Sequence, residues 1–285
     1  MTFSTVVAPP IPASMSTTVS TDLALARLKR QPDIRLPEGV CEINDMTVVS
    51  PDMLLVSNNR QQCLQLLNCM KENVVSEVQL QNYPYRLCLT DRNTAAVNVG
   101  FRKVQMIKVK DKTLTKGRDL TVSGDILGLT SSRNSLVVSY NSQPWLEVIS
   151  IDEKVLHQFD NLGTSLKLKY PDFMCTTPGG SVFLSDNGTE TITKVDEQLH
   201  NLQTFASPLL KWPSGITAVS EGQILVCSKG NNSLVLLKPS TNTMSTLLGK
   251  DDGIELPWSL TYCPDQKKVY VAPYNTDTIK VYQVW

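Results

Sequence analysis

A recurring apolar motif dominates the hydrophobic pattern of the chain. Six segments each place three apolar residues before a small or polar one, from residues 54–57 (LLVS) through residues 95–98, 136–139, 182–185 and 224–227 to residues 269–272 (VYVA). Their closing residues follow one another at intervals of 41, 41, 46, 42 and 45 residues. A repeat of about 40 to 45 residues is the period of a four-stranded propeller blade. The pattern therefore predicts six blades.

Three further stretches accompany each motif and complete a four-stranded unit. Turn-forming sequences such as SDNGTE follow the motif, and a second apolar centre comes after them, at Leu64, Val104, Leu146, Ile192, Leu234 and Ile279. A strand precedes each motif, and in four repeats proline introduces it, at Pro84, Pro171, Pro213 and Pro257. Proline suits the start of a strand because it cannot donate inside a ladder. Polar stretches such as NLQTFA follow the hairpins and are typical of outer edges.

The sixth unit ends before an outer strand, at IKVYQVW. An uncovered edge there favours aggregation, so we expect residues 33–36 (DIRL), which lie just ahead of the first inner strand, to supply the missing strand. The motifs themselves are apolar on both pleat faces, which indicates strands sandwiched between neighbouring blades. The predicted fold is an all-β, six-bladed propeller over residues 33–285, with its last blade closed by an N-terminal strand.

Residues 1–32 form a different kind of segment. They begin with a stretch rich in Pro, Ser and Thr and without apolar periodicity, which predicts a flexible lead-in. Residues 21–31 (TDLALARLKRQ) follow, and we expect a short helix there, capped by Thr21. The low-complexity start suggests that the chain is the C-terminal part of a longer protein.

Several repeats resemble the NHL repeat, in which a proline-led inner strand is followed by a glycine turn, a polar loop and another strand. The resemblance rests on residues 212–216 (WPSGI), 222–237 (GQILVCSKGNNSLVLL), 171–196 and 257–283, and it extends over residues 41–285. The aspartate usual after the apolar triplet is kept only as Asp186 and is replaced elsewhere by Ser57, Asn98, Ser139, Cys227 and Ala272.

This resemblance implies a function as well as a fold. Propellers similar to this one stand at the C-termini of tripartite-motif ubiquitin ligases, where they recognise substrate and a RING domain recruits the ubiquitin-conjugating enzyme. This chain has no RING, B-box or coiled coil. We therefore expect a non-catalytic binding platform, which oligomerises only if a coiled coil lies upstream.

Composition narrows the classes of partner and compartment. Lys and Arg together number 27, as do Asp and Glu, so no net field attracts nucleic acid or an anionic membrane. No apolar run approaches the roughly 18 residues that span a bilayer, and the first twenty residues lack the pattern of a secretory signal. Seven cysteines without a CxxC pair indicate buried thiols and no zinc site or disulfide framework. We expect a cytoplasmic protein that does not bind membranes.

Candidate catalytic chemistry is sparse. His157 and His200 fall in predicted outer strands more than a blade apart, and the chain has no GxSxG motif or glycine-rich phosphate loop. We therefore predict no catalytic residue, metal or cofactor. One enzymatic alternative is a six-bladed, calcium-dependent lactonase or esterase, whose metal needs six to eight oxygen ligands. The starts of the inner strands offer a mixed ring for it: Asn44, Asp45, Asp125 and Asp172 against Arg86, Ser214 and Trp258.

One face of the predicted ring collects aromatic and charged residues in the loops within hairpins and between blades. Tyr, Trp and Arg are enriched at interface hot spots, so we take this face as the partner-binding site. Its candidate residues are Arg60, Tyr85, Arg86, Arg102, Tyr140, Trp145, Tyr170, Asp172, Trp212, Trp258 and Tyr274. Acidic residues interleave with the basic ones and favour a protein or peptide ligand. Two alternatives stay open: single-stranded RNA bound by stacking and charge, and Trp212 and Trp258 packing between blades instead of binding.

Overall fold

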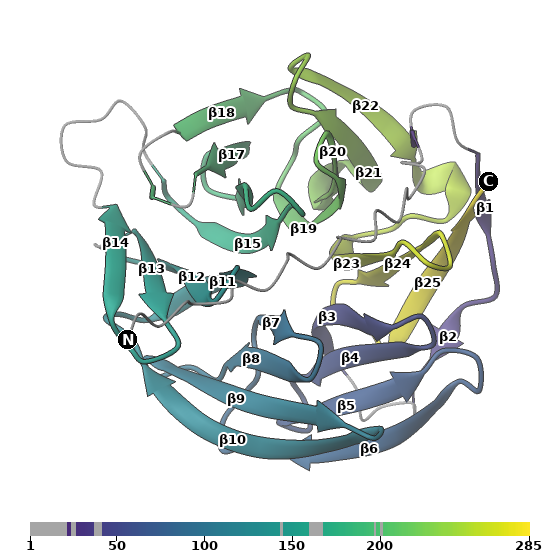
Figure 1. The fold of residues 1–285 in the computed structure, drawn as a ribbon. Coiled ribbons are helices and arrows are strands. Elements are labelled where there is room, and N and C mark those ends of the chain that lie inside the picture. The colour runs from purple at the N-terminus through teal and green to yellow at the C-terminus, as the bar shows by residue number, and fades with distance from the viewer. Residues whose placement is uncertain are drawn as a thin grey trace, which may run out of the picture.

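The protein folds into a ring of six antiparallel β-sheets (Figure 1). The computed structural model describes residues 22–23, 27–36, 42–142, 145–159, 168–196, 198–199 and 202–285. His200, Cys41 and residues 1–21 of the expected lead-in lie outside these described residues. In five of the sheets the strands follow one another outward from the centre of the ring in chain order, and in the sixth the N-terminal strands occupy the outer edge. This arrangement confirms the predicted all-β propeller with six four-stranded blades.

The strands have the following bounds. Blade 1 contains β3 (Ile43–Ser50), β4 (Met53–Asn58), β5 (Cys63–Asn68) and β6 (Asn73–Gln79). Blade 2 contains β7 (Leu87–Asp91), β8 (Thr94–Asn98), β9 (Lys103–Lys110) and β10 (Thr113–Thr121). Blade 3 contains β11 (Ile126–Ser132), β12 (Ser135–Tyr140), β13 (Leu146–Ser150) and β14 (Val155–Phe159).

The second half of the ring repeats this order. Blade 4 contains β15 (Pro171–Thr176), β16 (Val182–Asp186), β17 (Thr191–Val195) and β18 (Leu202–Ala206). Blade 5 contains β19 (Pro213–Ser220), β20 (Gln223–Ser228), β21 (Ser233–Lys238) and β22 (Thr243–Leu248). Blade 6 contains β23 (Pro257–Cys263), β24 (Lys268–Pro273) and β25 (Thr278–Val284), and it is completed by β1 (Leu28–Arg30) and β2 (Ile34–Arg35).

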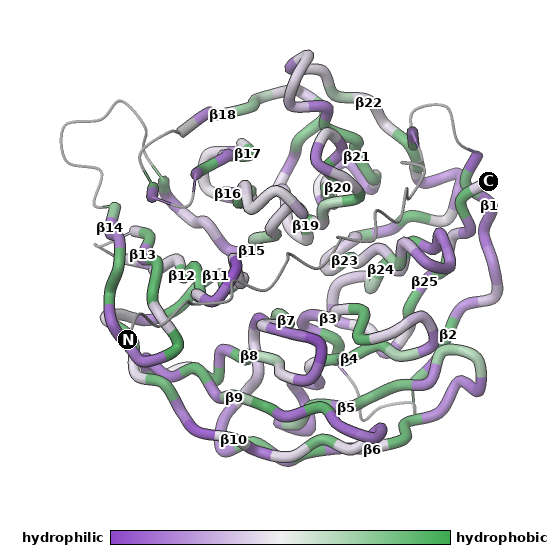
Figure 2. The backbone as a smooth tube through the Cα atoms, viewed as in Figure 1, coloured by the Kyte–Doolittle hydropathy of each residue, from purple (hydrophilic) through white to green (hydrophobic). Residues whose placement is uncertain are grey.

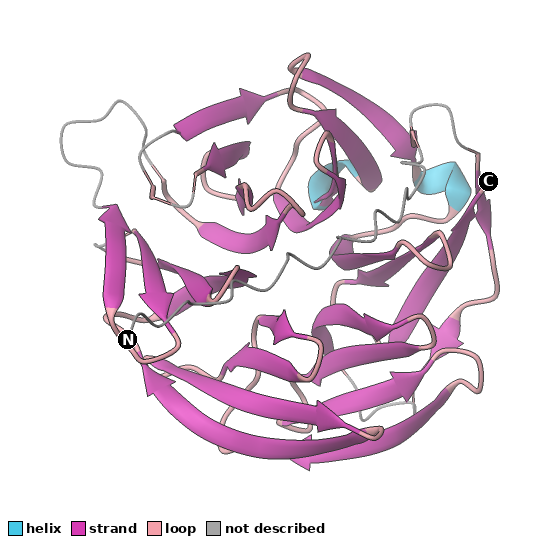
Figure 3. Cartoon of the chain, viewed as in Figure 1, coloured by secondary structure: helices cyan, strands magenta, loops and turns pink. Residues whose placement is uncertain are grey.

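Strands make up nearly all of the regular structure, as Figure 3 shows. Within the described residues, the helices are two 3₁₀ turns of three residues each, η1 (Lys229–Asn231) and η2 (Lys250–Asp252). Neither they nor any other described helix is long and apolar enough to cross a membrane.

Burial follows the position of a strand in its blade. Every residue of β4 and of β5 is buried, because these middle strands are covered on both faces by neighbouring blades. The outermost strand β6 has no buried residue, and β10 buries two of nine. Figure 2 shows the same gradient, with hydrophobic middle strands and a largely hydrophilic β10. The apolar motifs thus form the six interfaces between blades.

A circle of side-chain hydrogen bonds joins the blades where their inner strands begin. In four blades the polar residue that closes the apolar motif donates to a carbonyl of the next blade: Ser57 Oγ to Tyr85 O at 3.5 Å, Asn98 Nδ2 to Ile126 O at 3.2 Å, Ser139 Oγ to Pro171 O at 2.5 Å and Ser185 Oγ to Ser214 O at 2.7 Å. In the other two, inner-strand serines make the link: Ser214 Oγ to Pro257 O at 3.0 Å and Ser259 Oγ to Asp45 Oδ1 at 2.7 Å. In these four blades the polar closing residue of the motif therefore connects one blade to the next.

The N-terminal segment covers the free edge of β25, as predicted. Two short strands pair with this edge in succession: β1 pairs Leu28 with Val284, and β2 pairs Ile34 with Ile279. Pro32 lies between them, where its missing N–H interrupts the ladder. The closing strand therefore begins at Leu28, five residues before the predicted start of the propeller.

The helix expected over residues 21–31 is wrong where the structure describes this segment. Residues 28–30 form a strand. An isolated helix of this length is marginal in water, whereas the open edge of β25 offers a full set of backbone hydrogen bonds. Tertiary pairing therefore overrides the local helical pattern.

Leu23 anchors the chain ahead of the closing strands. Its side chain is fully buried between blades 5 and 6, against Leu225 and Tyr282 among others. Its N–H donates to Gln223 Oε1 at 2.7 Å, and the neighbouring Asp22 pairs with Lys238 at 3.1 Å. The N-terminal segment thus fastens blade 5 as well as blade 6.

Shortening this anchor destabilises the ring. We expect Leu23→Ala to lower the free energy of unfolding by about 3 kcal/mol, since a buried leucine leaves a cavity when it is truncated. Urea unfolding followed by tryptophan fluorescence measures the change. Leu156→Ala, at a half-exposed site on β14, is the control and shifts stability by less than about 0.5 kcal/mol. Equal effects of the two substitutions contradict the anchor.

Candidate functional site

The aromatic and basic loops gather on one face of the ring. Successive strands of a blade run in opposite directions. The start of each inner strand therefore lies at the same end of the blade as the turn between its second and third strands. We call this surface the loop face. It consists of residues 59–62, 80–86, 99–102, 122–125, 141–142, 145, 168–170, 187–190, 207–212, 229–232, 249–256 and 274–277.

The predicted site residues divide by exposure. Six are exposed on the loop face: Arg60, Tyr85, Arg102, Tyr170, Trp212 and Tyr274. Trp145, Asp172 and Trp258 are partly buried, while Arg86 and Tyr140 are buried. The structure brings Arg86, Asp172, Trp258 and Tyr274 together through a chain of contacts, and it spreads the others over the loops of blades 1 to 5.

Tyr140 is a structural residue, so its assignment to the partner site is wrong. Its ring is fully buried and its hydroxyl donates to Glu147 Oε2 at 2.6 Å. Ser123 Oγ and Gln158 Nε2 donate to the other oxygen of the same carboxylate. Burial and the Glu147 charge raise the pKa of Tyr140. Tyr140 lies close to a loop, but its hydroxyl acts as a hydrogen-bond donor to the buried carboxylate of Glu147.

Arg86 lies across the centre of the ring. Its Nη2 pairs with Asp172 Oδ1 of blade 4 at 2.6 Å, and its Nη1 donates to Asn44 Oδ1 of blade 1 at 3.3 Å. Its guanidinium carbon stands 3.5 Å from the centroid of the Phe173 ring. The side chains of this ion pair are 5% and 14% exposed. Three blades are thus tied together at the loop-face end of the central cavity.

Three aromatic rings lead outward from Arg86. Phe173 and Trp258 meet edge to face with centroids 5.2 Å apart, and Trp258 meets Tyr274 in the same way at 5.1 Å. Trp258 Nε1 donates to Asn44 Oδ1 at 3.2 Å. At the outer end, Lys229 Nζ lies 3.6 Å from the Tyr274 centroid and 4.8 Å from that of Trp258. We call Phe173, Trp258 and Tyr274 the aromatic ladder.

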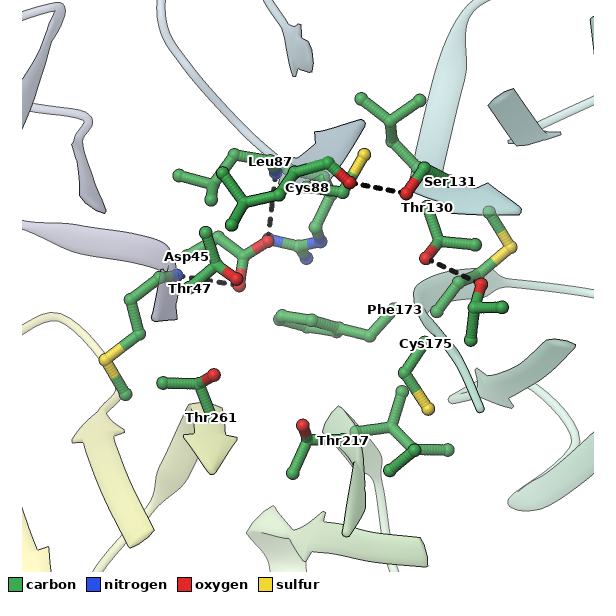
Figure 4. A pocket seen from close by; sticks show the side chains of 18 of the residues that line it. Asp45, Thr47, Leu87, Cys88, Thr130, Ser131, Phe173, Cys175, Thr217 and Thr261 are labelled. Atoms are coloured by element: carbon green, nitrogen blue, oxygen red, sulfur yellow. Dashed lines mark hydrogen bonds between the residues drawn. The ribbon is translucent and has the colours of Figure 1, made fainter. Parts of the chain in front are cut away.

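A central cavity of about 510 Å³ lies beneath this closed end. All six inner strands line it, and it extends to Arg133, Thr177 and Pro178 in or beside the first hairpin turns of blades 3 and 4. Each inner strand contributes one residue of a polar ring, which pairs with the middle residue of the apolar motif: Thr47, Cys88, Thr130, Cys175, Thr217 and Thr261. Figure 4 shows these six side chains around the cavity.

The sequence analysis missed this ring of threonines and cysteines. Aligning the repeats on their motifs reveals it, because the position recurs at a fixed register. Burial raises the pKa of Cys88 to about 12 and raises that of Cys175 as well. Both thiols are therefore protonated near neutral pH and are poor nucleophiles. The cavity lining contains no histidine among the described residues.

The residues that the lactonase alternative would use for calcium do not form a cage. Asn44 and Asp172 direct oxygens at Arg86, whose guanidinium already supplies the positive charge. Asp45 accepts from Leu87 N at 3.0 Å and from Ser259 Oγ at 2.7 Å, and Asp125 is exposed. Across the part of the chain that the structure describes, no three acidic, His or Cys residues cluster as a metal site. These residues fit structural hydrogen bonding better than metal binding.

Comparisons with known proteins identify the architecture. No protein-family model matches the chain, and no curated protein matches it by sequence. Among solved structures, a Bacteroides thetaiotaomicron protein of unknown function matches with a TM-score of 0.73 and 14% identity, over 91% of this chain and 76% of its own. A catalytically inactive histidine-to-alanine variant of virginiamycin B lyase from Staphylococcus aureus, with quinupristin, matches with a TM-score of 0.66 and 12% identity, over 90% and 99%.

A third match is a propeller domain from another organism. The Cps50 (Swd1) propeller domain of Myceliophteria thermophila has a TM-score of 0.62 and 11% identity, over 85% of this chain and 84% of that domain. Identities this low establish a shared propeller fold and nothing about chemistry. Propellers host many unrelated functions, so the function must be argued from the site itself.

The ion pair at the centre of the ring gives a direct test of this geometry. We expect Asp172→Asn to destabilise the protein by about 3 to 5 kcal/mol, since it leaves Arg86 as an unpaired charge in a largely buried site. Adding Arg86→Met removes that charge and restores part of the loss. A double-mutant cycle in urea measures the coupling. Strictly additive effects contradict the ion pair as described.

Proposed function

We propose that this propeller is a binding platform that recognises a protein or peptide through its loop face. One observation carries the proposal: of the eleven large hydrophobic side chains that are exposed in the described residues, seven lie on this face. They are Tyr83, Tyr85, Phe101, Tyr170, Trp212, Leu256 and Tyr274. Exposed aromatic groups gathered on one surface are typical of a protein interaction site.

Backbone strain at three of these positions supports the proposal. Phe101, Trp212 and Leu256 have φ angles of 51°, 48° and 40°, in the left-handed region that favours glycine or asparagine. A bulky side chain costs about 1 kcal/mol or more there. Exposed side chains at strained positions contribute little to folding. Contact with a partner explains why large apolar residues occupy them.

The charges of the loop face favour a protein over a polyanion. Lys211 pairs with Glu190 at 3.0 Å, and Arg86 pairs with Asp172. A nucleic acid binds best to an uninterrupted basic surface, because its affinity depends on the number of phosphates neutralised. RNA binding therefore stays the second hypothesis.

Catalysis finds less support in the described residues. The lyase named above loses activity when one histidine becomes alanine. Here His157 lies on the outer strand β14, away from the cavity lining, and the two cavity cysteines are protonated near neutral pH.

The resemblance to NHL repeats extends the binding proposal: the propeller recognises substrates for a tripartite-motif-like ubiquitin ligase whose RING lies elsewhere in the protein.

Exchanging a strained aromatic residue for asparagine separates binding from stability. Trp212→Asn weakens partner binding by about tenfold or more, because it removes an exposed anchor. It leaves the thermal midpoint unchanged or raised, because asparagine tolerates a positive φ. Trp285→Asn, at an exposed tryptophan beyond the far end of β25, is the control.

The assay is recovery of proteins and RNA from nuclease-treated and untreated cytosolic lysate by the purified variants, followed by affinity measurement with the enriched partner. Nuclease-resistant recovery that Trp212→Asn reduces and Trp285→Asn does not is the expected result. Recovery of RNA alone, or equal recovery by both variants, contradicts the proposal.

A further inference from the structure

Two cationic side chains contact the rings of the aromatic ladder, one at each end. Arg86 lies over Phe173 at the buried end, and Lys229 lies over Tyr274 at the exposed end. Both also approach Trp258 between them, at 5.3 and 4.8 Å from its centroid. The two sites share their aromatic partners, so they can be compared directly.

The two cations differ in how their charge is balanced. Arg86 has a carboxylate, that of Asp172, at 2.6 Å. Lys229 has no carboxylate within ion-pair distance in the described part of the chain, and its ammonium group meets the two rings alone. Partial burial lowers the pKa of Lys229. The neighbouring Lys211, in contrast, is paired with Glu190 at 3.0 Å.

The backbone holds Lys229 in place. Its N–H donates to Trp212 O at 3.4 Å, and the next N–H, that of Gly230, donates to Lys211 O at 2.9 Å. A Cβ on Gly230 would stand 2.7 Å from the Lys211 side chain, so this close approach requires glycine. At the other end of η1, Asn232 Oδ1 accepts from Leu256 N at 2.7 Å. The loop is therefore pre-organised.

These hydrogen bonds also tie the backbones of two exposed apolar residues to the loop that carries Lys229. Trp212 is 52% exposed and Leu256 is 42% exposed, and each is tied through its backbone to one end of η1. A cation with no carboxylate partner among the described residues thus lies against the ring of Tyr274, in a loop whose ends are hydrogen-bonded to the backbones of Trp212 and Leu256. A ligand that matches this surface carries one negative charge with apolar groups around it.

We infer that the partner presents an acidic side chain to Lys229, with large apolar residues on either side of it that contact Trp212 and Leu256. The inference rests on the proposed function and specifies its ligand. An acidic carboxylate supplies the charge that Asp172 supplies to Arg86, and a charge-assisted bond in a desolvated site is worth more than one in water. An RNA phosphodiester fits less well, because Lys211 and Arg86 are already paired within the protein.

Synthetic peptides that differ at one position test this inference. The probes are short peptides with a leucine and a phenylalanine flanking glutamate, glutamine or lysine, with a single-stranded oligouridylate as the RNA probe. We expect the glutamate peptide to bind about tenfold more tightly than the glutamine peptide, as a hydrogen bond to a charged group provides. Lys229→Met reduces that preference to about twofold or less, and Lys229→Glu reverses it toward the lysine peptide.

Two controls separate this inference from the proposed function. Lys169→Met removes an exposed cation of the same face, and it leaves the preference for glutamate unchanged. Trp212→Asn weakens the binding of all three peptides. Peptides that bind in a Trp212-dependent way but without preference for glutamate overturn the inference alone. If no peptide binds, or if Lys229 governs only oligouridylate binding, both the inference and the proposed function are overturned.

Discussion

The circle of side-chain hydrogen bonds between blades is the constraint on which the rest of this structure depends. Apolar packing holds neighbouring blades together, but packing alone does not set how far one inner strand slides along the next. The hydrogen bonds from Ser57, Asn98, Ser139 and Ser185 to carbonyls of the following blade fix the position of each inner strand relative to the next. Asp45 completes the circle by accepting from both Ser259 of blade 6 and Leu87 of blade 2. Because the links lie where inner strands begin, they also fix the loops of the loop face.

The fixed loops explain how one face combines a rigid centre with an exposed rim. Arg86 at the centre is buried and fully paired, so it serves folding. The same aromatic ladder continues to Tyr274 at the surface, where Lys229 lacks a carboxylate partner in the described part of the chain. Under the proposed function, stability and recognition share the rings of Trp258 and its neighbours. The structure itself shows the packing role of Trp258, which contacts Phe173 and Tyr274.

The sequence was sufficient to predict the ring, because each apolar motif repeats once per blade and each buried middle strand needs that pattern. It also predicted closure by the N-terminus, since β25 would otherwise keep an open edge. It did not predict that Leu23 is buried, because the apolar residues of TDLALARLKRQ fit a short helix, and nothing in the local pattern indicates which leucine packs against the ring. Nor did it place Arg86 and Asp172 in one ion pair. Those residues are 86 positions apart, and repeat spacing fixes contacts within a blade and between neighbours, not across the ring.

The same limit applies to the candidate site. Repeat alignment assigned eleven residues to one face, but only the packing of the blades shows that Tyr140 points inward to Glu147. Strain at Phe101, Trp212 and Leu256 depends on the backbone conformation of each loop, which residue type alone does not give. The ring of threonines and cysteines in the cavity was present in the aligned repeats as a recurring position. Only the packing of the six inner strands around the cavity shows that this position lines it.

Hydrogen–deuterium exchange of the propeller with and without its most enriched protein partner decides whether the loop face is the binding surface, because it locates the bound surface without altering a residue. We expect protection in residues 207–212, 229–232, 249–256 and 274–277 of the loop face, with the opposite mouth of the cavity unchanged. Protection confined to the turns around Arg133 and Thr177, at that opposite mouth, would contradict this expectation and would direct attention to the central cavity instead.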